Sequence, residues 1–230
     1  MDDEIPLLVA DEAPLNADDA IPSIPVILLT GLLGCGKTTF IHSVLSSADT
    51  HRRRVAIVMN DYDQGADLER QILIGKLGNT HAGWISLNNG CLCCSLKDVS
   101  VRAVEIMVEQ AYRTQNPIDI VIVEVAGNAD PLPVVTSFWL DDALQSCLRL
   151  HGVLAILDTP AFIHNLSNPL VDRQVAMADH ILLNKTDLIP KNLLDKIQCA
   201  ETTIRNMNPL AILYSTEYAR YFLLIFFCFI

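Results

Sequence analysis

A glycine-rich loop is the first group of residues whose types and spacing could do chemistry. The string GLLGCGKT at residues 31–38 follows an apolar run, VILLT, which predicts a strand over residues 26–30. Between a strand and a helix, such a loop cradles phosphates with its backbone N–H groups. The glycines that would let the backbone bend are Gly31, Gly34 and Gly36.

Two residues that follow these glycines would do the electrostatic work. Lys37 would reach the β- and γ-phosphates, and the Thr38 hydroxyl would ligate Mg²⁺. The alternative is a glycine-rich turn that binds nothing, which the strand-to-helix setting makes the weaker interpretation. The loop therefore predicts a nucleotide phosphate site.

A second string, NKTD at residues 184–187, could select the base. Asp187 can accept hydrogen bonds from guanine N1–H and from the exocyclic amine, groups that adenine lacks. Lys185 would lie along the purine face, and Asn184 would tie this loop to the phosphate loop. Four residues alone would be a solvated loop, but after a phosphate loop they predict GTP in preference to ATP.

Acidic residues at two predicted strand ends are candidates for catalysis. Glu124 could hold a Mg²⁺-bound or attacking water, and the Gly127 N–H could sense the γ-phosphate. The alternative is a strand-end acid that caps the following loop. The polar residues Asn60, Asp61 and Asp63 follow another strand and would also lie near the metal, and the sequence does not choose among them.

Three cysteines lie within four positions of the string GCLCCSLKD, residues 90–98. The thiols of Cys91, Cys93 and Cys94 can converge on one ion where the chain turns at Gly90. Thiolates suit Zn²⁺ or Cu(I), and three ligands leave a tetrahedral position open for transfer. The alternatives are buried small apolar residues or one redox pair.

The strands that would position these residues are apolar runs. They cover residues 26–30, 54–60, 84–87, 118–125, 152–158 and 180–184, with helices predicted from the phosphate loop to about residue 48 and over 97–115. A short amphipathic stretch occupies about 68–77. Continuous apolar strands separated by helical segments predict an α/β P-loop NTPase with a mostly parallel sheet and helices on both faces. Ligands would bind beyond the strand ends at Thr30, Asn60, Glu124, Asp158 and Asn184.

Composition limits the classes of partner. The formal charge is −11, and residues 1–24 carry seven carboxylates without a Lys or Arg, so this acidic stretch is expected to be a flexible tail. Without a basic stripe, nucleic acid is not an expected partner. Seven cysteines in this spacing and an N-terminus unlike a signal peptide favour a soluble protein of the cytosol or nucleus, away from membranes.

The last residues are unusual. YFLLIFFCFI at 221–230 has ten apolar residues, too few for a membrane-spanning helix. A buried strand and the scar of a truncated gene model are the two interpretations, and we favour the scar. The expected organisation is therefore a tail at 1–24, a GTPase domain at 25–216 and an apolar tail at 217–230.

The order of these motifs resembles that of the CobW family of GTPases. The resemblance runs from about Ile24 to about Tyr214 and is closest to the eukaryotic zinc-regulated GTPase metalloprotein activators. The strings that carry it are WISLNNGCLCCSLKD, VEVAGNADPLPVV, RQVAMADHILLNKTDLIP and Asn208-Pro209-Leu210-Ala211.

The resemblance implies zinc delivery driven by GTP hydrolysis. It implies a zinc site at Cys91, Cys93 and Cys94, and nucleotide contacts from Asn184 to Asp187 and from Gly34 to Thr39, a range that includes Cys35. In the eukaryotic branch the client is methionine aminopeptidase, bound through an N-terminal hydrophobic-Pro-x-Leu-Val motif. Ile5–Val9 matches this motif, although chance prolines in a disordered tail are an equal alternative.

The sequence also departs from the family pattern. Asp61 replaces Glu, Tyr62-Asp63 replaces Phe-Gly, and Val125-Ala126 fills the middle of the E-T-T-G-like motif, changes that would slow hydrolysis without abolishing it. The C-terminal domain of full-length relatives is missing, which would impair metal transfer or client release. Two alternatives therefore remain: a nucleotide- and zinc-binding module without useful turnover, and a nickel-type metallochaperone GTPase.

Overall fold

Parallel strands form the centre of the molecule. The computed structural model describes residues 22–51, 54–59, 84–86, 97–142, 146–165, 168–190 and 194–218. Within these residues, seven strands stand in the order β3-β2-β4-β1-β5-β6-β7, and all neighbouring pairs are parallel. The predicted α/β class is confirmed, and the described strands are parallel throughout rather than mostly so.

The elements alternate along the chain, as parallel pairing requires. The strands are β1 (Ile24–Thr30), β2 (Val55–Met59), β3 (Trp84–Ser86), β4 (Ile120–Glu124), β5 (Leu148–Asp158), β6 (His180–Asn184) and β7 (Ile212–Ser215). The helices are α1 (Lys37–His51), α3 (Lys97–Arg113), α4 (Leu132–Asp142), α5 (Thr159–His164), α6 (Pro169–Met177) and α7 (Leu194–Met207), with a short 3₁₀ turn, η1, at Thr186–Leu188.

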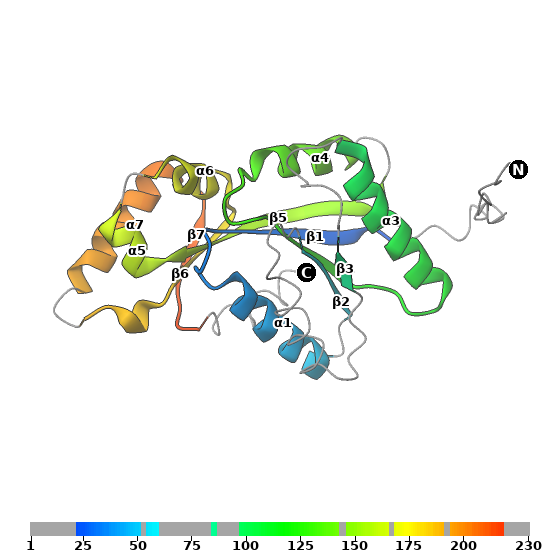
Figure 1. Cartoon of the computed structure of the whole chain (residues 1–230), viewed down its shortest axis with the longest axis horizontal. Coiled ribbons are helices and arrows are strands. Elements are labelled where there is room, and N and C mark those ends of the chain that lie inside the picture. Colours follow the sequence, from blue (N-terminus) through cyan, green and yellow to red (C-terminus); the bar gives the residue numbers. More distant parts are fainter. Residues whose placement is uncertain are drawn as a thin grey trace, which may run out of the picture.

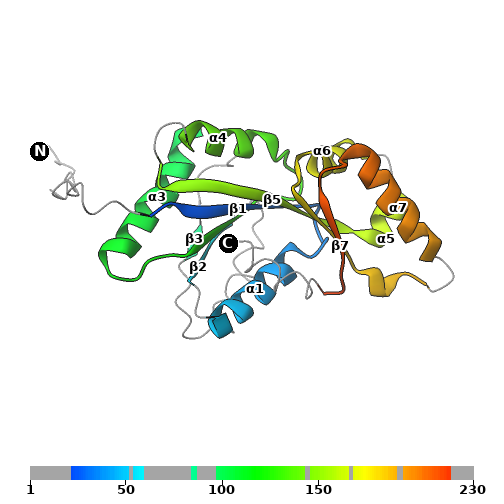
Figure 2. The same cartoon turned by 180° about the vertical axis from the view of Figure 1, so that it is seen from behind.

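The two faces of the sheet are covered by different helices. Figure 1 shows α1 on one side of the sheet and α3 and α4 on the other, and Figure 2 shows the same layers from behind. Side chains alternate between these layers along β1: Ile27 and Leu29 pack with Phe40 of α1, whereas Val26 and Leu28 pack with the layer of α3 and α4. The apolar runs are therefore buried on both sides.

A third apolar cluster lies toward the β7 edge, on the same face as α3 and α4. Residues of β5 and β6 whose side chains point to this face pack against α5, α6 and α7. The cluster includes Ala155, Leu157, Phe162, Val175 and Ile204. This packing fixes the ends of β5 and β6 beside the loop that follows β1.

All six predicted strands are present, and β6 has the predicted ends, whereas each of the other five is shifted at one or both ends. β5 begins at Leu148 rather than residue 152, because Leu148–Leu150 pair with β1 across a bulge between Val26 and Ile27. The helix predicted over 97–115 ends at Arg113, and Gln115 adopts a left-handed φ of 58°. β7 was not predicted, since this short edge strand is only partly buried. The amphipathic stretch at 68–77 lies outside the described residues.

A helix that crosses a bilayer needs about 20 consecutive, mostly apolar residues. Within the described ranges, no helix is both long and apolar enough to cross a bilayer.

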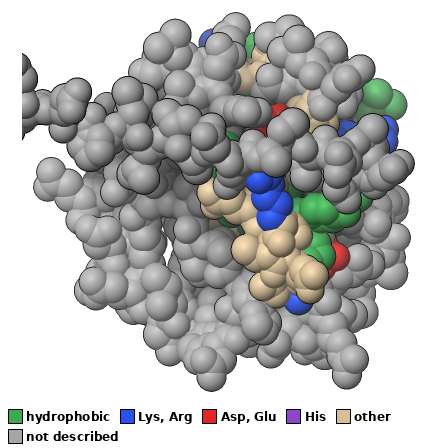
Figure 3. Space-filling view, turned by 90° about the vertical axis from the view of Figure 1, so that its right-hand side faces the viewer, with side chains coloured by type: hydrophobic (Ala, Val, Ile, Leu, Met, Phe, Trp, Pro, Cys, Tyr) green, Lys and Arg blue, Asp and Glu red, His purple; other side chains and the backbone are tan. Residues whose placement is uncertain are grey.

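On the end of the molecule beside α3, Figure 3 shows described basic, acidic and hydrophobic side chains close together. The described charges visible there are of both signs.

Candidate functional site

The loop between β1 and α1 depends on glycine at defined positions. Gly31, Gly34 and Gly36 have φ values of 144°, 76° and 114°, which L side chains rarely adopt. A Cβ at Gly31 would lie 2.3 Å from the Ile156 carbonyl oxygen, and one at Gly36 would lie 2.4 Å from the Asn184 side-chain nitrogen. The loop can therefore fold closely against the ends of β5 and β6 only without these side chains.

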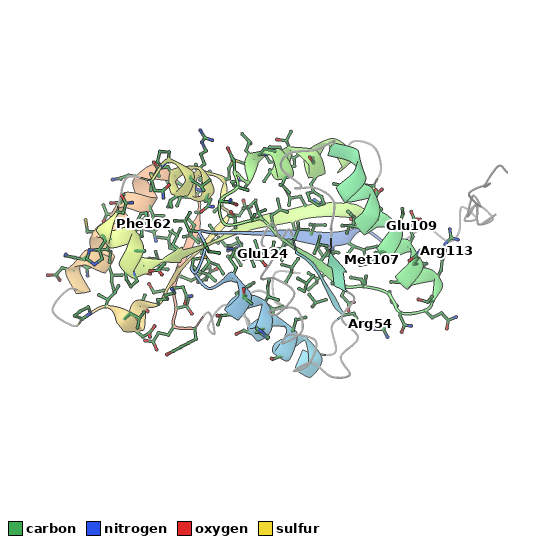
Figure 4. All side chains as sticks on the ribbon, in the orientation of Figure 1. Arg54, Met107, Glu109, Arg113, Glu124 and Phe162 are labelled. Carbon is green, nitrogen blue, oxygen red and sulfur yellow. The ribbon has the colours of Figure 1, made fainter. Side chains whose placement is uncertain are left out.

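Lys37, the first residue of α1, directs its ammonium group back into this loop. Its Nζ donates to the carbonyl oxygens of Gly31 at 3.0 Å and Leu32 at 3.4 Å. It also lies 3.7 Å from Glu124 Oε1, and the two side chains are only 6% and 13% exposed. Figure 4 shows Glu124 near the beginning of α1. Thr38 is half-buried and Thr39 is exposed.

The segment after β4 lies directly against the glycine-rich loop. The Val125 N–H donates to the Leu29 carbonyl at 2.8 Å, which continues the pairing of β4 with β1. A Cβ at Gly127 would lie 2.6 Å from the Leu33 nitrogen and would clash with backbone that cannot move independently. Glu124 and Gly127 are thus brought to the loop that holds Lys37.

The loop after β6 is joined to the same place. The Asn184 side-chain amide donates to the Cys35 carbonyl at 3.0 Å, in a buried contact between residues far apart in sequence. This is the connection to the glycine-rich loop expected of Asn184. Asp187 is exposed at the start of η1, so its carboxylate is accessible to a ligand.

Neighbouring elements brace the loop after β6 on two sides. From the start of α5, the Thr159 hydroxyl donates to the Asn184 carbonyl at 2.7 Å. From the end of β5, Asp158 Oδ2 accepts from Lys185 Nζ at 2.6 Å. From the end of β7, the Thr216 carbonyl accepts from the Thr186 hydroxyl at 3.1 Å. The loop therefore has its polar partners before any base binds.

A family model matches most of the chain. The nucleotide-binding domain of the CobW/HypB/UreG family matches residues 25–214. The chain belongs to this family. The glycine-rich loop, the end of β4 and the loop after β6 are accordingly parts of a CobW/HypB/UreG nucleotide-binding domain.

Two curated relatives have names that refer to zinc. "Zinc-regulated GTPase metalloprotein activator 1" of Schizosaccharomyces pombe is 36% identical over 213 residues, covering 90% of this chain and 49% of the yeast protein. "Zinc chaperone YjiA" of Escherichia coli is 30% identical over 166 residues, covering 72% of this chain and 50% of the bacterial protein. The chain spans about half the length of these relatives.

A solved structure supports the fold. The crystal structure of Zn(II)-bound YjiA GTPase from E. coli matches with a TM-score of 0.57 and 24% identity, covering 84% of this chain and 57% of that chain. At this identity the match shows the fold alone, which is that of the P-loop GTPases.

The structure separates the predicted site residues into two groups. It brings Gly31–Thr39, Glu124, Gly127 and Asn184–Asp187 to one edge of the sheet. Asp61 and the cysteines Cys91, Cys93 and Cys94 lie outside the described residues, as do Asn60 and Asp63. Within the described residues, no three His, Cys, Asp or Glu side chains cluster as metal ligands.

Cys35, inside the glycine-rich loop, has a perturbed thiol. Burial raises its pKa above the ordinary value for cysteine, and the nearby Lys37 ammonium opposes this shift only in part. The raised pKa keeps the Cys35 thiol protonated and so less nucleophilic than an exposed cysteine. Its contribution to the site is the backbone carbonyl that binds Asn184.

Sequence reasoning placed Asp158 at a strand end near the ligand but did not find its contact with Lys185, and it missed Thr159 and Thr216. Only Asp158 carried a signal, because it is a polar residue at the end of an apolar run. Thr159 and Thr216 act through contacts that join the ends of different strands. Knowing the order of strands β5, β6 and β7 would have placed all three beside the NKTD loop.

Proposed function

We propose that this domain binds and hydrolyses GTP and couples hydrolysis to the handling of zinc for a client metalloprotein. The observation that carries the nucleotide part is the Asn184–Cys35 hydrogen bond, which joins a phosphate-binding loop to a guanine-type loop in one family domain. The zinc part is supported by relatives named zinc-regulated GTPase metalloprotein activator and zinc chaperone. The domain occupies residues 25–216, between the acidic and apolar tails.

The described residues fit GTP and Mg²⁺ by their chemistry. Three glycines with positive φ let the loop backbone bend so that its N–H groups can face an anion, and a buried ammonium lies beside them. Lys37 neutralises phosphate charge and Thr38 supplies a hydroxyl ligand for Mg²⁺, which when bound would offset the charge that develops on the phosphates. Glu124 orients water, and the Gly127 N–H contacts the γ-phosphate.

The guanine site is formed by the loop after β6. Asp187 accepts the two guanine hydrogen bonds, and the methylene stem of Lys185 covers the purine face. Asn184 keeps the loop after β6 at a fixed distance from the phosphate loop, because its side-chain amide donates to the backbone carbonyl of Cys35 in the phosphate loop. Base and phosphate recognition are thereby joined in one site. Asp61 is a further catalytic candidate.

Zinc is the cargo in this proposal, and its ligands are Cys91, Cys93 and Cys94. A zinc titration against a chelating indicator tests it, run with no nucleotide, with GDP and with a non-hydrolysable GTP analogue. Replacing all three cysteines by Ser should remove the tight site and leave nucleotide binding intact. Affinity should fall as the pH drops, because zinc displaces thiol protons.

A matched control uses two of the other cysteines. A variant with Cys147→Ser and Cys199→Ser alters a half-buried and an exposed thiol and should bind zinc like the parent. Equal affinity of the parent and the triple variant would refute the zinc proposal, and tighter binding of nickel than of zinc would favour a nickel chaperone. Because coupling is reciprocal, any effect of the GTP analogue on zinc affinity must equal the effect of zinc on that nucleotide.

The finer part of the proposal is the client, methionine aminopeptidase, in the cytosol or nucleus. Ile5–Val9 would dock on it through the hydrophobic-Pro-x-Leu-Val pattern. Pro6→Ala with Leu8→Ala should weaken binding to the purified aminopeptidase, whereas Pro14→Ala with Leu15→Ala in the same acidic stretch should not. Unchanged binding of the first variant would exclude this client contact.

A further inference from the structure

Asp158 uses its two carboxylate oxygens for two separate contacts. Oδ1 accepts from the Ala161 N–H at 2.9 Å and caps the start of α5. Oδ2 accepts from Lys185 Nζ at 2.6 Å. Asp158 is the last residue of β5 and is in register with Asn184 of β6, so the residue that follows Asn184 lies beside it.

Lys185 is constrained at both ends of its side chain. Its backbone has a φ of 62°, in the left-handed region that non-glycine residues rarely adopt. Its ammonium group is bound to Asp158, which is itself anchored at the start of α5. The methylene stem between these two points can therefore adopt only a few conformations.

We propose that Asp158 is a positioning residue for guanine nucleotides, and that it acts by holding the Lys185 stem where the purine stacks. The proposal rests on the guanine role of the loop after β6 proposed above. The Lys185 and Asp158 side chains are 32% and 24% exposed, and ion pairs at such positions contribute little to stability. The ion pair therefore acts by fixing the position of the Lys185 side chain, and its effect appears in the affinity for the base.

The test is the substitution Asp158→Asn, which keeps a capping side chain for α5 and removes the charge that binds Lys185. Affinity for GDP and for IDP should fall together by about 2- to 5-fold, as expected from losing a half-exposed ion pair. IDP lacks the exocyclic amine, so the GDP/IDP affinity ratio reports on Asp187 and should stay constant. The midpoint of thermal unfolding without nucleotide should also stay constant.

A second background shows whether Asp158 acts through Lys185. Lys185→Met keeps an unbranched stem without the charge, so adding Asp158→Asn to it should cause no further loss of GDP affinity. A full 2- to 5-fold loss in that background would overturn the proposal. If Asp158→Asn proves unstable, Asp158→Ser offers another capping residue for the same cycle.

The chain offers a closely matched control in Asp130. Its Oδ1 accepts from the Leu132 N–H at 3.0 Å near the start of α4, and its Oδ2 accepts from Arg173 at 2.9 Å. It is 27% exposed, similar to Asp158, but its cation is not in the NKTD loop. Asp130→Asn should leave GDP affinity unchanged, and an equal loss in both variants would overturn the proposal.

Asp187→Asn separates failure of this inference from failure of the guanine site. If Asp187→Asn weakens GDP binding about 10- to 150-fold while Asp158→Asn has no effect, the guanine site stands and the role of Asp158 is refuted. If neither substitution changes GDP affinity, the base does not bind at this loop and both proposals fall.

Discussion

The phosphate loop, Gly31–Thr38, and the loop after β6, Asn184–Asp187, which we call the base loop, differ in where their polar side chains find hydrogen-bond partners. In the phosphate loop, Lys37 is held by two carbonyl oxygens of the same loop and lies near Glu124. In the base loop, the polar groups of residues 184–186 are bound by partners from the phosphate loop, from the end of β5, from the start of α5 and from the residue after β7. The hydrogen bonds of the Lys37 ammonium thus go to its own loop, whereas those of the side chains of residues 184–186 go to neighbouring elements.

This difference indicates that ligand binding makes different demands on the two loops. If the nucleotide binds as proposed, neighbouring elements already support the base loop, so a purine can enter with little rearrangement. The ammonium of Lys37 would have to exchange carbonyl oxygens for phosphate oxygens, and the carboxylate of Glu124 would have to accept a changed neighbour. Nucleotide binding is therefore expected to reorganise the phosphate loop more than the base loop.

The largest effect is expected from Lys37→Ala. Removal of the ammonium deletes the charge that the phosphates would take over, and each hydrogen bond to a charged group contributes about 1.5–3 kcal/mol. GTP hydrolysis, measured as phosphate release, should fall by about 100-fold or more. Circular dichroism should show that the variant is folded.

Lys196→Ala is the control for this experiment, because Lys196 is an exposed lysine of α7 that belongs to neither loop. It should hydrolyse GTP at the parent rate. A Lys37→Ala variant that also kept the parent rate would show that the activity comes from another site or from a contaminating enzyme. The comparison of the two loops would then lose its functional meaning.

The sequence predicted the parts of this molecule that local patterns encode. Apolar runs such as the one ending at Glu124 located six strands, since a strand buried on both faces has no polar positions to break it. The glycines of the phosphate loop were identified because backbone conformation demands them, as their φ values show. The motif at residues 184–187 was identified because it stands at the end of a predicted strand and comes after a phosphate loop in the chain.

The sequence could not predict contacts that depend on which strand ends are neighbours. A single Thr or Asp at a strand end is common, and its role emerges only when another strand end lies beside it. Thr216 binds Thr186 because β7 adds to the edge of the sheet beside β6, and this short, partly exposed strand has little hydrophobic pattern. The zinc hypothesis at Cys91–Cys94 lies outside the described residues and stays a prediction.

A smaller effect, which measures the connection between the loops, is expected from Asn184→Ala. The Asn184 amide is buried and donates to the Cys35 carbonyl, which would lose this partner in the variant. An unsatisfied buried carbonyl costs about 1–3 kcal/mol, so the free energy of unfolding in urea should fall by that amount without nucleotide. GTP affinity should also fall, since the base loop would no longer be fixed relative to the phosphate loop.

Asn206→Ala is the control, because it also removes an asparagine side chain but at an exposed position. Asn206 is exposed on α7, and its replacement should leave the free energy of unfolding within about 0.5 kcal/mol of the parent.

If Asn184→Ala lowers GTP affinity but unfolds like Asn206→Ala, the hydrogen bond is made only when nucleotide is bound. The base loop would then not be braced in advance, and both loops would reorganise on binding. If Asn184→Ala loses stability with or without nucleotide, the bond between the loops is part of the fold, and the reorganisation is confined to Lys37 and its neighbours.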